Sequence, residues 1–277
     1  PTPEPTPEPT PEPGFVNPFN GSLMYEPWTA RPYAVMLNNH PDSFPQWGNS
    51  QADILFEVLA EGSITRMLAV YSDFAAVEKV GSLRSARPYY IELALSLDAI
   101  YVHAGGSDAA YERFWTEGID HHDMTRGLYA YSFMPAMQDL ERLRTGKGSE
   151  HTWYTSGELM IQATQEKEFR EEVKDPETYD TGLHFEQDAQ LEEGETAETV
   201  RVCFYDGYKS SYFYYDADSG LYGMQAWGAD FVDGNTGKQL QFENVIAISA
   251  EGWILDDYGR RSFVLANAEG EGYYAHN

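Results

Sequence analysis

The chain has 277 residues, of which 42% are hydrophobic, and 45 acidic against 18 basic residues give a formal net charge of −27. This hydrophobic content is enough for a folded core, so the body of the chain is not disordered. A surface this acidic repels nucleic acid and anionic lipid at long range, which excludes general nucleic-acid binding but leaves room for a local basic pocket.

A Thr-Pro-Glu-Pro repeat occupies residues 1–13. Proline fixes φ and lacks an N–H, so this segment is expected to be extended and solvated. We interpret residues 1–16 as a disordered Pro-rich tether, typical of the spacer between a membrane anchor and an exported domain. The chain begins inside the repeat without a signal peptide, which predicts a processed start.

Residues 17–165 are predicted to form an N-terminal mixed α/β sheet domain. Residues 32–37 are predicted to form a strand, because apolar and aromatic residues precede a turn-like Asn-Asn-His-Pro segment. A β-hairpin follows, with strands over 54–59 and 64–71 and a turn at 61–63.

The second half of this domain alternates strands with helices. A short strand is predicted over 78–83, and Pro88 suits the first turn of a helix that continues to residue 97. A strand over 98–103, a glycine turn and a helix over 108–117 come next. This alternation predicts an α+β fold.

The remaining chain divides by composition. Thirteen acidic residues accumulate between 166 and 198, which we interpret as a solvated acidic connector, with a charged binding tail as the alternative. Residues 199–277 contain short β-type runs separated by Asp-Gly turns and are predicted to form a small, mainly antiparallel β domain. Within this domain, Cys203 is expected to be a buried strand residue, and 233–237 is a plain turn rather than a calcium loop.

The hairpin carries an unusual set of charges. Side chains alternate along a strand, so Asp53, Glu57 and Glu61 share one face. A two-residue turn would place Arg66 opposite Leu59 and diagonal to two of these acids. One interpretation is a solvated face with cross-strand ion pairs, and the other is the floor of a polar pocket. In the second, Asp53 and Glu57 are candidate general bases or Mg²⁺ ligands.

Arginines form a local concentration in a chain with few basic residues. Arg84 and Arg87 stand three positions apart before Pro88, and Arg66 lies on the neighbouring hairpin. Guanidinium groups bind phosphate and carboxylate through paired hydrogen bonds. The three arginines therefore predict an anion site, unless they only neutralise the hairpin acids.

A strand, a glycine turn and a helix start provide a second candidate anion-binding element. Gly105, Gly106 and Ser107 precede the predicted helix, where free N–H groups and the helix dipole attract anions. His103, at the end of the preceding strand, is a third candidate general base. A metal site is an open alternative without a recognised ligand spacing, using the set His40, His103, His121, His122, Asp123 and His151.

Several segments together resemble one family, the two-domain YerB-type lipoproteins of the Gram-positive cell envelope. The segments that carry the resemblance are 31–39, 52–54, 61–66, 81–89, 101–107 and 151–156. The last of them adds His151 to the candidate ligand-binding residues. The resemblance implies a protein held outside the cytoplasmic membrane by a lipid on a cysteine upstream of this chain. It implies no established activity, because the family is uncharacterised.

A weaker resemblance concerns charge order alone. The order of charged residues along the chain is similar to the Asp and Arg arrangement in LytR-type envelope phosphotransferases. These residues are Asp53, Arg66, Arg84 and Arg87, with predicted strands or loops between them. Those enzymes transfer lipid-pyrophosphate-linked glycopolymers to peptidoglycan.

These observations favour an envelope protein whose N-terminal domain binds a phosphorylated lipid-linked precursor or an anionic cell-wall glycopolymer. The domain could also process this ligand with the help of Mg²⁺. The first alternative is a non-catalytic module that binds an envelope protein or a glycan through the 20 Tyr and six Trp residues. The second is a glycan hydrolase that uses Glu57 and Glu61. No nucleic-acid partner is expected, and membrane contact is expected only through the lipid anchor that this chain lacks.

Overall fold

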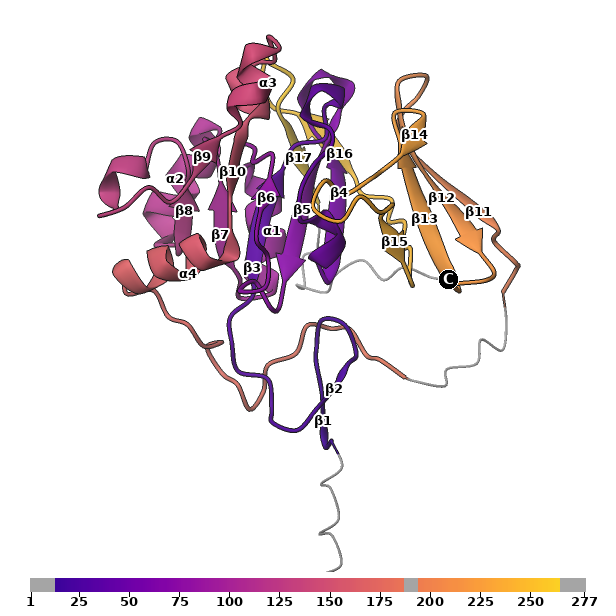
Figure 1. Ribbon diagram of the computed structural model, residues 1–277, viewed down its shortest axis with the longest axis horizontal. Coiled ribbons are helices and arrows are strands. Elements are labelled where there is room, and N and C mark those ends of the chain that lie inside the picture. The colour runs from indigo at the N-terminus through magenta and orange to yellow at the C-terminus, as the bar shows by residue number, and fades with distance from the viewer. Residues whose placement is uncertain (1–12, 187–193, 265–277) are drawn as a thin grey trace, which may run out of the picture.

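The computed structural model describes residues 13–186 and 194–264, so most of the predicted tether, residues 1–12, lies outside the described residues. Regular structure begins inside the segment assigned to the tether. Strand β1 (Phe15–Val16) pairs antiparallel with β2 (Leu23–Met24) at the lower end of the molecule (Figure 1).

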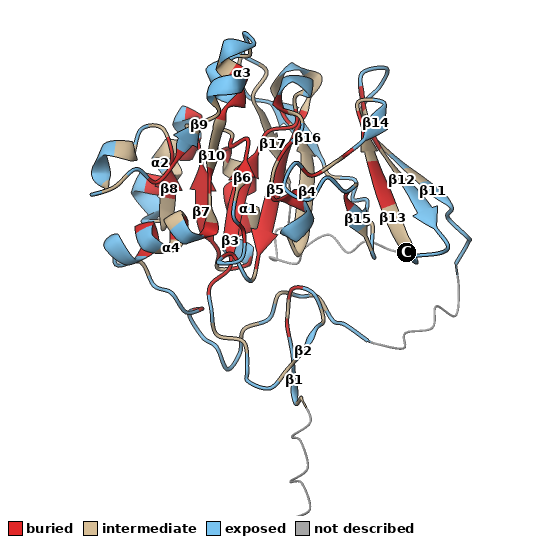
Figure 2. Cartoon of the chain, in the orientation of Figure 1, coloured by how far each residue is buried: buried red, intermediate tan, exposed pale blue. Residues whose placement is uncertain are grey.

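A mixed five-stranded sheet forms the centre of the N-terminal domain, in the order β4-β5-β3-β7-β8. The first three strands pair antiparallel, whereas β3, β7 and β8 are parallel. The strands of this sheet are β3 (Tyr33–Leu37), β4 (Ile54–Leu59), β5 (Thr65–Tyr71), β7 (Ile100–His103) and β8 (His121–Asp123). Its buried residues concentrate on the middle strands β5, β3 and β7 (Figure 2).

Two helices, α1 (Pro88–Ser96) and α2 (Asp108–Glu117), cover one face of this sheet. Proline starts α1 because its fixed φ suits the first helical position. Ser107 caps α2 by accepting a hydrogen bond from the Ala110 N–H, and Gly118 ends that helix in the left-handed conformation. Both helices begin where the sequence predicts them.

The opposite face of the sheet packs against helix α4 (Gly157–Glu166) and a small antiparallel sheet, β6-β10-β9. Gly157 starts α4 against a neighbouring loop, where a Cβ atom would lie 1.6 Å from the Phe74 carbonyl oxygen. The bounds of the remaining elements are β6 (Val80–Gly81), β9 (Met137–Gln138), β10 (Trp153–Thr155), α3 (Leu140–Arg144) and the 3₁₀ turns η1 (Pro41–Ser43), η2 (Asn49–Gln51), η3 (Glu61–Ser63), η4 (Leu128–Ala130) and η5 (Ser149–His151).

The C-terminal region is an antiparallel sheet, which confirms the predicted fold class. Its strands are β11 (Thr199–Tyr205), β12 (Lys209–Asp216), β13 (Leu221–Ala226), β14 (Ala229–Asp230) and β15 (Gln241–Phe242), followed by the separate hairpin β16 (Gly252–Ile254) and β17 (Arg261–Phe263). Cys203 lies on β11 as expected but is exposed, because β11 is an edge strand.

The two regions share one hydrophobic core. Met224, Phe231 and Leu240 of the C-terminal sheet belong to the same buried cluster as Val35 and Met67 of the central sheet. Beside this cluster, Asp233 is fully buried and accepts hydrogen bonds from the backbone N–H groups of residues 48 and 50. The predicted turn at 233–237 therefore fastens the C-terminal region to the N-terminal domain.

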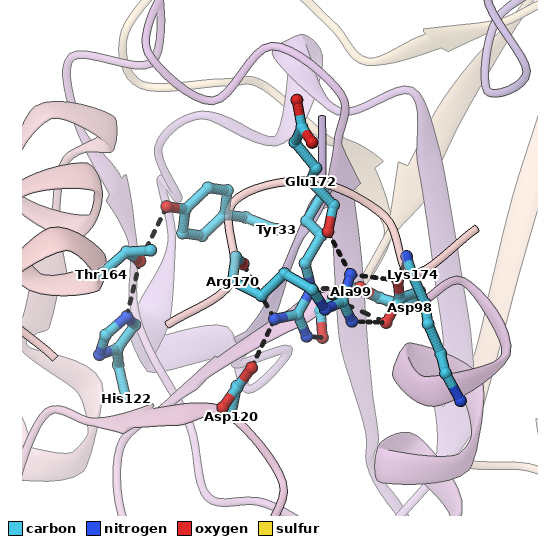
Figure 3. A network of polar contacts seen from close by, with 10 residues as sticks. Tyr33, Asp98, Ala99, Asp120, His122, Thr164, Arg170, Glu172 and Lys174 are labelled. Carbon is cyan, nitrogen blue, oxygen red and sulfur yellow. Dashed lines mark hydrogen bonds and ion pairs between the residues drawn. The ribbon is translucent and has the colours of Figure 1, made fainter. Parts of the chain in front are cut away.

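The acidic segment after α4 is not solvated throughout, contrary to the prediction. Val173 is only 2% exposed, and its N–H bonds to the Thr29 carbonyl oxygen. Arg170 forms an ion pair with Asp98 at 2.6 Å, and Arg31 donates to the Arg170 carbonyl oxygen at 3.1 Å (Figure 3). The part of this segment near α4 thus lies along the domain, because basic residues in and beside it hold it there. Residues 187–193 of the predicted connector lie outside the described residues.

Candidate functional site

Two arginines pair with one carboxylate at the end of the β4–β5 hairpin, and a third arginine lies near them. Arg66 projects from β5 and donates to Glu61 at 2.9 Å and to the Ser85 carbonyl oxygen at 2.8 Å. Arg87, the residue before α1, donates to the other oxygen of Glu61. Arg84 lies in the segment between them, close enough for its charge to lower the pKa of Arg66. The sequence therefore predicted correctly that these three residues gather.

Positive charge exceeds negative charge in this cluster. Burial, reinforced by the nearby Arg87 charge, lowers the pKa of Arg66 to about 10, so the guanidinium is still protonated at neutral pH. Burial alone would raise the pKa of Glu61, but Arg66 and Arg87 hold it below its usual value. In the described part of the chain, Arg84 forms no ion pair, and the buried Nε atoms of Arg66 and Arg84 have no hydrogen-bond acceptor.

The predicted register of the hairpin is wrong by one residue. Arg66 pairs with Val58, not Leu59, because the chain turns through three residues, two of which, Gly62 and Ser63, have positive φ. A one-residue shift moves a side chain to the other face of a sheet. Arg66 consequently faces the α1 side, whereas Glu57 faces the C-terminal sheet.

Glu57 belongs to a separate, buried ion pair between the two regions. Its carboxylate lies 2.8 Å from the Nζ of Lys209, whose side chain is fully buried, and accepts from the Ser211 hydroxyl at 2.7 Å. Thr65 and Asn39 donate to its other oxygen. Glu57 therefore has no free oxygen for a substrate proton or for Mg²⁺, and its predicted catalytic role is not supported.

Asp53 is also occupied by structural contacts. One oxygen accepts from the Ser72 backbone N–H at 2.6 Å, and the other accepts from the Asn20 side chain at 2.6 Å. Asp53 directly precedes β4, which carries Glu57, but the two carboxylates do not form a common Mg²⁺ site.

His103 is fully buried, and its ring bonds to Gly105 and His121 rather than to the arginine side chains. Its Nδ1 donates to the Gly105 carbonyl oxygen at 2.7 Å, and its Nε2 lies 2.9 Å from the Nδ1 of His121. Burial lowers the pKa of both imidazoles, that of His121 to about 4, so the pair is neutral at neutral pH. The structure therefore assigns His103 to the core rather than to a site for a general base.

The glycine turn does not present its amides to a ligand as predicted. The Gly105 N–H donates to the Asp123 carboxylate at 3.0 Å, and the Ser107 N–H donates to the Ala86 carbonyl oxygen at 3.3 Å. Gly106 bridges to Ala86 in parallel register. Of the predicted turn residues, Ser107 nevertheless lines the same cavity as Arg87.

Asp123 holds this turn together and should make stability depend on pH. It accepts hydrogen bonds from Gly105, Thr125 and Tyr111. Burial would raise its pKa, but the neighbouring His103 and these bonds lower it from 3.8 to about 2.

Because the pKa of Asp123 is lower in the folded than in the unfolded chain, its ionised carboxylate stabilises the fold above the unfolded-state pKa. About 2 kcal/mol of this stability should be lost as the pH falls from ~4 to ~2. Urea unfolding across this range should show a flatter pH dependence for Asp123→Asn; an unchanged slope would contradict this role.

A cavity of about 230 Å³ opens beside Arg87, between the start of α2 and the β16–β17 hairpin. Arg260 and Arg261 line it from the C-terminal side, together with Asp108 and Asp256. Arg260 pairs with Asp256 at 2.9 Å, whereas Arg261 forms no ion pair with a described residue. Sequence reasoning missed Arg261, although two adjacent arginines in a chain with so few basic residues were a usable signal.

His151, the last predicted ligand-binding residue, lies next to the arginine cluster, but its ring contacts Asn38 and His40. Its Nδ1 contacts the Asn38 side chain at 2.9 Å, and its ring stacks on His40 at 4.8 Å between centroids. Burial lowers the pKa of His151, and the charge of Arg84 lowers it further. Arg84 therefore stands between the arginine cluster and this pair of histidines.

Both regions of the chain match a known protein family. Residues 21–170 match the family described as "Protein of unknown function (DUF3048) N-terminal domain", and residues 200–277 match the corresponding C-terminal domain. Over 238 residues, the chain is 30% identical to "Putative lipoprotein YerB" of Bacillus subtilis (strain 168), which corresponds to 85% of this chain and 67% of that protein.

The fold is similar as well. The crystal structure of the YerB protein from Bacillus subtilis matches with a TM-score of 0.75 and 30% identity, over 91% of this chain and 80% of that chain. In the described residues, no helix has the length and apolar character needed to cross a membrane. The matches in sequence and fold confirm the resemblance, and the chain belongs to the two-domain DUF3048 family that includes YerB.

Proposed function

We propose that this chain is the exported part of a lipid-anchored envelope protein, and that its N-terminal domain binds an anionic, phosphate-bearing cell-wall precursor or polymer. The anchor is inferred from the relative named as a lipoprotein and from the Thr-Pro-Glu repeat at the start of the chain. The ligand class is inferred from Arg66, Arg84 and Arg87.

The observation that carries the proposal is that two guanidiniums share one carboxylate, Glu61, and that a third, Arg84, lies beside them without an ion pair among the described residues, in a protein with a net charge of −27. Arg66 and Arg87 are 4% and 7% exposed, so their charges are largely removed from water. A buried charge without a partner is costly, and a phosphate that accepts hydrogen bonds from Arg84 and its neighbours would offset that cost. Arg261 adds a further positive charge near Tyr89, which the charges of Arg66 and Arg87 also reach.

The surroundings favour binding over catalysis. Asp53 is saturated by hydrogen bonds, Glu57 is paired with Lys209, and His103 is buried with His121. A general base must reach the proton that it removes, and none of these three groups faces the arginines. The same contacts argue against a glycan hydrolase, because Glu57 and Glu61 face different sides of the sheet and are both ion-paired.

Arg84→Ala tests this function without removing a partner from any carboxylate in the described structure. Loss of a charge-assisted hydrogen bond costs about 1.5–3 kcal/mol, so affinity for poly(glycerol phosphate) should fall by roughly ten- to a hundredfold. Isothermal titration calorimetry of the full chain measures this, with dextran as a neutral polymer that should not bind.

The matched control is Arg144→Ala, since the Arg144 side chain is 75% exposed and its nearest acid, Glu141, is not part of the cluster. This variant should bind the polymer as the unaltered chain does. Equal losses in both variants would show that binding follows overall charge, and no saturable binding at low salt would contradict the proposal.

An exposed apolar segment favours a second candidate function, the recruitment of an envelope protein. Ile246, Ile248, Trp253, Ile254 and Tyr258 are each between 47% and 80% exposed. Exposed apolar groups on adjoining segments are typical of interaction surfaces. Trp253→Ser combined with Ile254→Ser should abolish capture of a partner from an envelope extract while leaving polymer binding unchanged.

A further inference from the structure

A second polar group lies beside the arginine cluster and has a different chemistry. One nitrogen from each of His40 and His151 and one oxygen of Asp42 lie within 4.8 Å of one another. The Nε2 of His151 also lies 3.8 Å from a carboxylate oxygen of Glu150. Two imidazoles and two carboxylates thus converge from two loops that are more than 100 residues apart in the chain.

Short turns position these side chains. His40 caps the 3₁₀ turn η1, with its Nδ1 accepting from the Asp42 N–H at 3.2 Å, and His151 ends the turn η5. Asn38 joins the two loops, because its oxygen accepts from the His40 N–H and its amide nitrogen contacts both His151 and the Glu150 carbonyl oxygen. The imidazoles are therefore held in place before any ligand arrives.

We propose that His40, Asp42 and His151 bind a divalent transition-metal ion of the Zn²⁺ class, with Glu150 as a fourth ligand. Imidazole nitrogen and carboxylate oxygen are ligands of Zn²⁺, whereas Mg²⁺ prefers oxygen ligands alone. This group differs from the predicted Mg²⁺ site at Asp53 and Glu57, whose oxygens are already occupied.

The group needs only a small contraction to surround an ion. Zinc bonds of about 2.0–2.2 Å in a tetrahedral site place ligand atoms roughly 3.5 Å apart, so side chains now within 4.8 Å must approach by about an ångström. The side chains of His40, Asp42 and Glu150 are 36%, 55% and 47% exposed and are free to move. His151, with a side chain only 8% exposed, is the fixed member.

The hydrogen bond on the other side of the His151 ring indicates which nitrogen can bind a metal. Because Asn38 occupies Nδ1, the metal is expected on Nε2, which shifts the ring proton to Nδ1. Asn38 is thus the group behind the metal-bound imidazole and fixes the orientation of the ring.

Calorimetric titration of the chelator-treated full chain with ZnCl₂ tests the proposal. We expect one equivalent to bind, and His40→Ala to weaken the affinity by more than about tenfold. Asp42→Asn should weaken binding in the same direction. Zinc should also raise the melting temperature of the unaltered chain but not that of His40→Ala.

The control variant is His184→Ala, because His184 is exposed and lies far along the chain in the acidic segment. It should retain full zinc affinity. His40 is partly exposed, so its removal leaves the fold intact, and circular dichroism checks this. The proposal is overturned if zinc does not saturate at one equivalent, or if His184→Ala reduces affinity as much as His40→Ala. Polymer binding by the same variants shows separately whether the arginine cluster is functional.

Discussion

The Glu57→Ala variant is expected to unfold with a free energy about 3–5 kcal/mol lower than that of the unaltered chain. The substitution leaves the ammonium of Lys209 buried without a counter-charge, because its side chain is fully buried against the central sheet. It also removes the acceptor for the Ser211 hydroxyl. Urea unfolding followed by tryptophan fluorescence measures the loss.

Two further variants isolate the cause of that loss. In Glu57→Gln with Lys209→Met, both charges are absent, so much of the lost stability should return. Glu92→Ala removes an acid whose side chain is 48% exposed and pairs with Arg113, and should change stability by less than about 1 kcal/mol. A Glu57→Ala variant as stable as Glu92→Ala would show that the buried pair does not hold the two regions together.

The Glu61→Gln variant should lose about 3 kcal/mol of stability and become sensitive to anions. Among the residues that the structure describes, Glu61 is the one carboxylate paired with Arg66 and Arg87, and both guanidiniums are buried. Without its negative charge, the two guanidiniums lack a counter-charge, and a bound phosphate can supply one and stabilise the folded state by mass action. Pyrophosphate should therefore raise the melting temperature of Glu61→Gln more than that of the unaltered chain.

The matched control for this variant is Glu141→Gln, which removes an acid with a side chain 76% exposed. Pyrophosphate should shift its melting temperature by the same amount as that of the unaltered chain. A Glu61→Gln variant that is destabilised but insensitive to pyrophosphate would mean that the three arginines are structural.

Local signals made the elements of the N-terminal domain predictable. Pro88 and Ser107 mark the starts of α1 and α2, and the run of apolar residues from 54 to 59 coincides with β4. The gathering of Arg66, Arg84 and Arg87 was also predictable, because neighbouring strands and the following loop place them near one another.

Contacts between distant parts of the chain were not predictable from local patterns. Lys209 is 152 residues from Glu57 and is an ordinary strand residue in the sequence, so nothing marked it as the buried partner. The hairpin register depended on positive φ at Ser63, which serine seldom adopts. The glycine turn resembled an anion site because Asp123, which occupies the Gly105 amide, comes from another strand.

The most direct test of anion binding is a crystal structure of the full chain saturated with pyrophosphate. Our account predicts phosphate oxygens within about 2.7–2.9 Å of the Arg84 guanidinium, next to Arg87 and the Glu61 carboxylate. Arginines that keep their present contacts around an empty cluster, at a pyrophosphate concentration where calorimetry shows saturation, would contradict it.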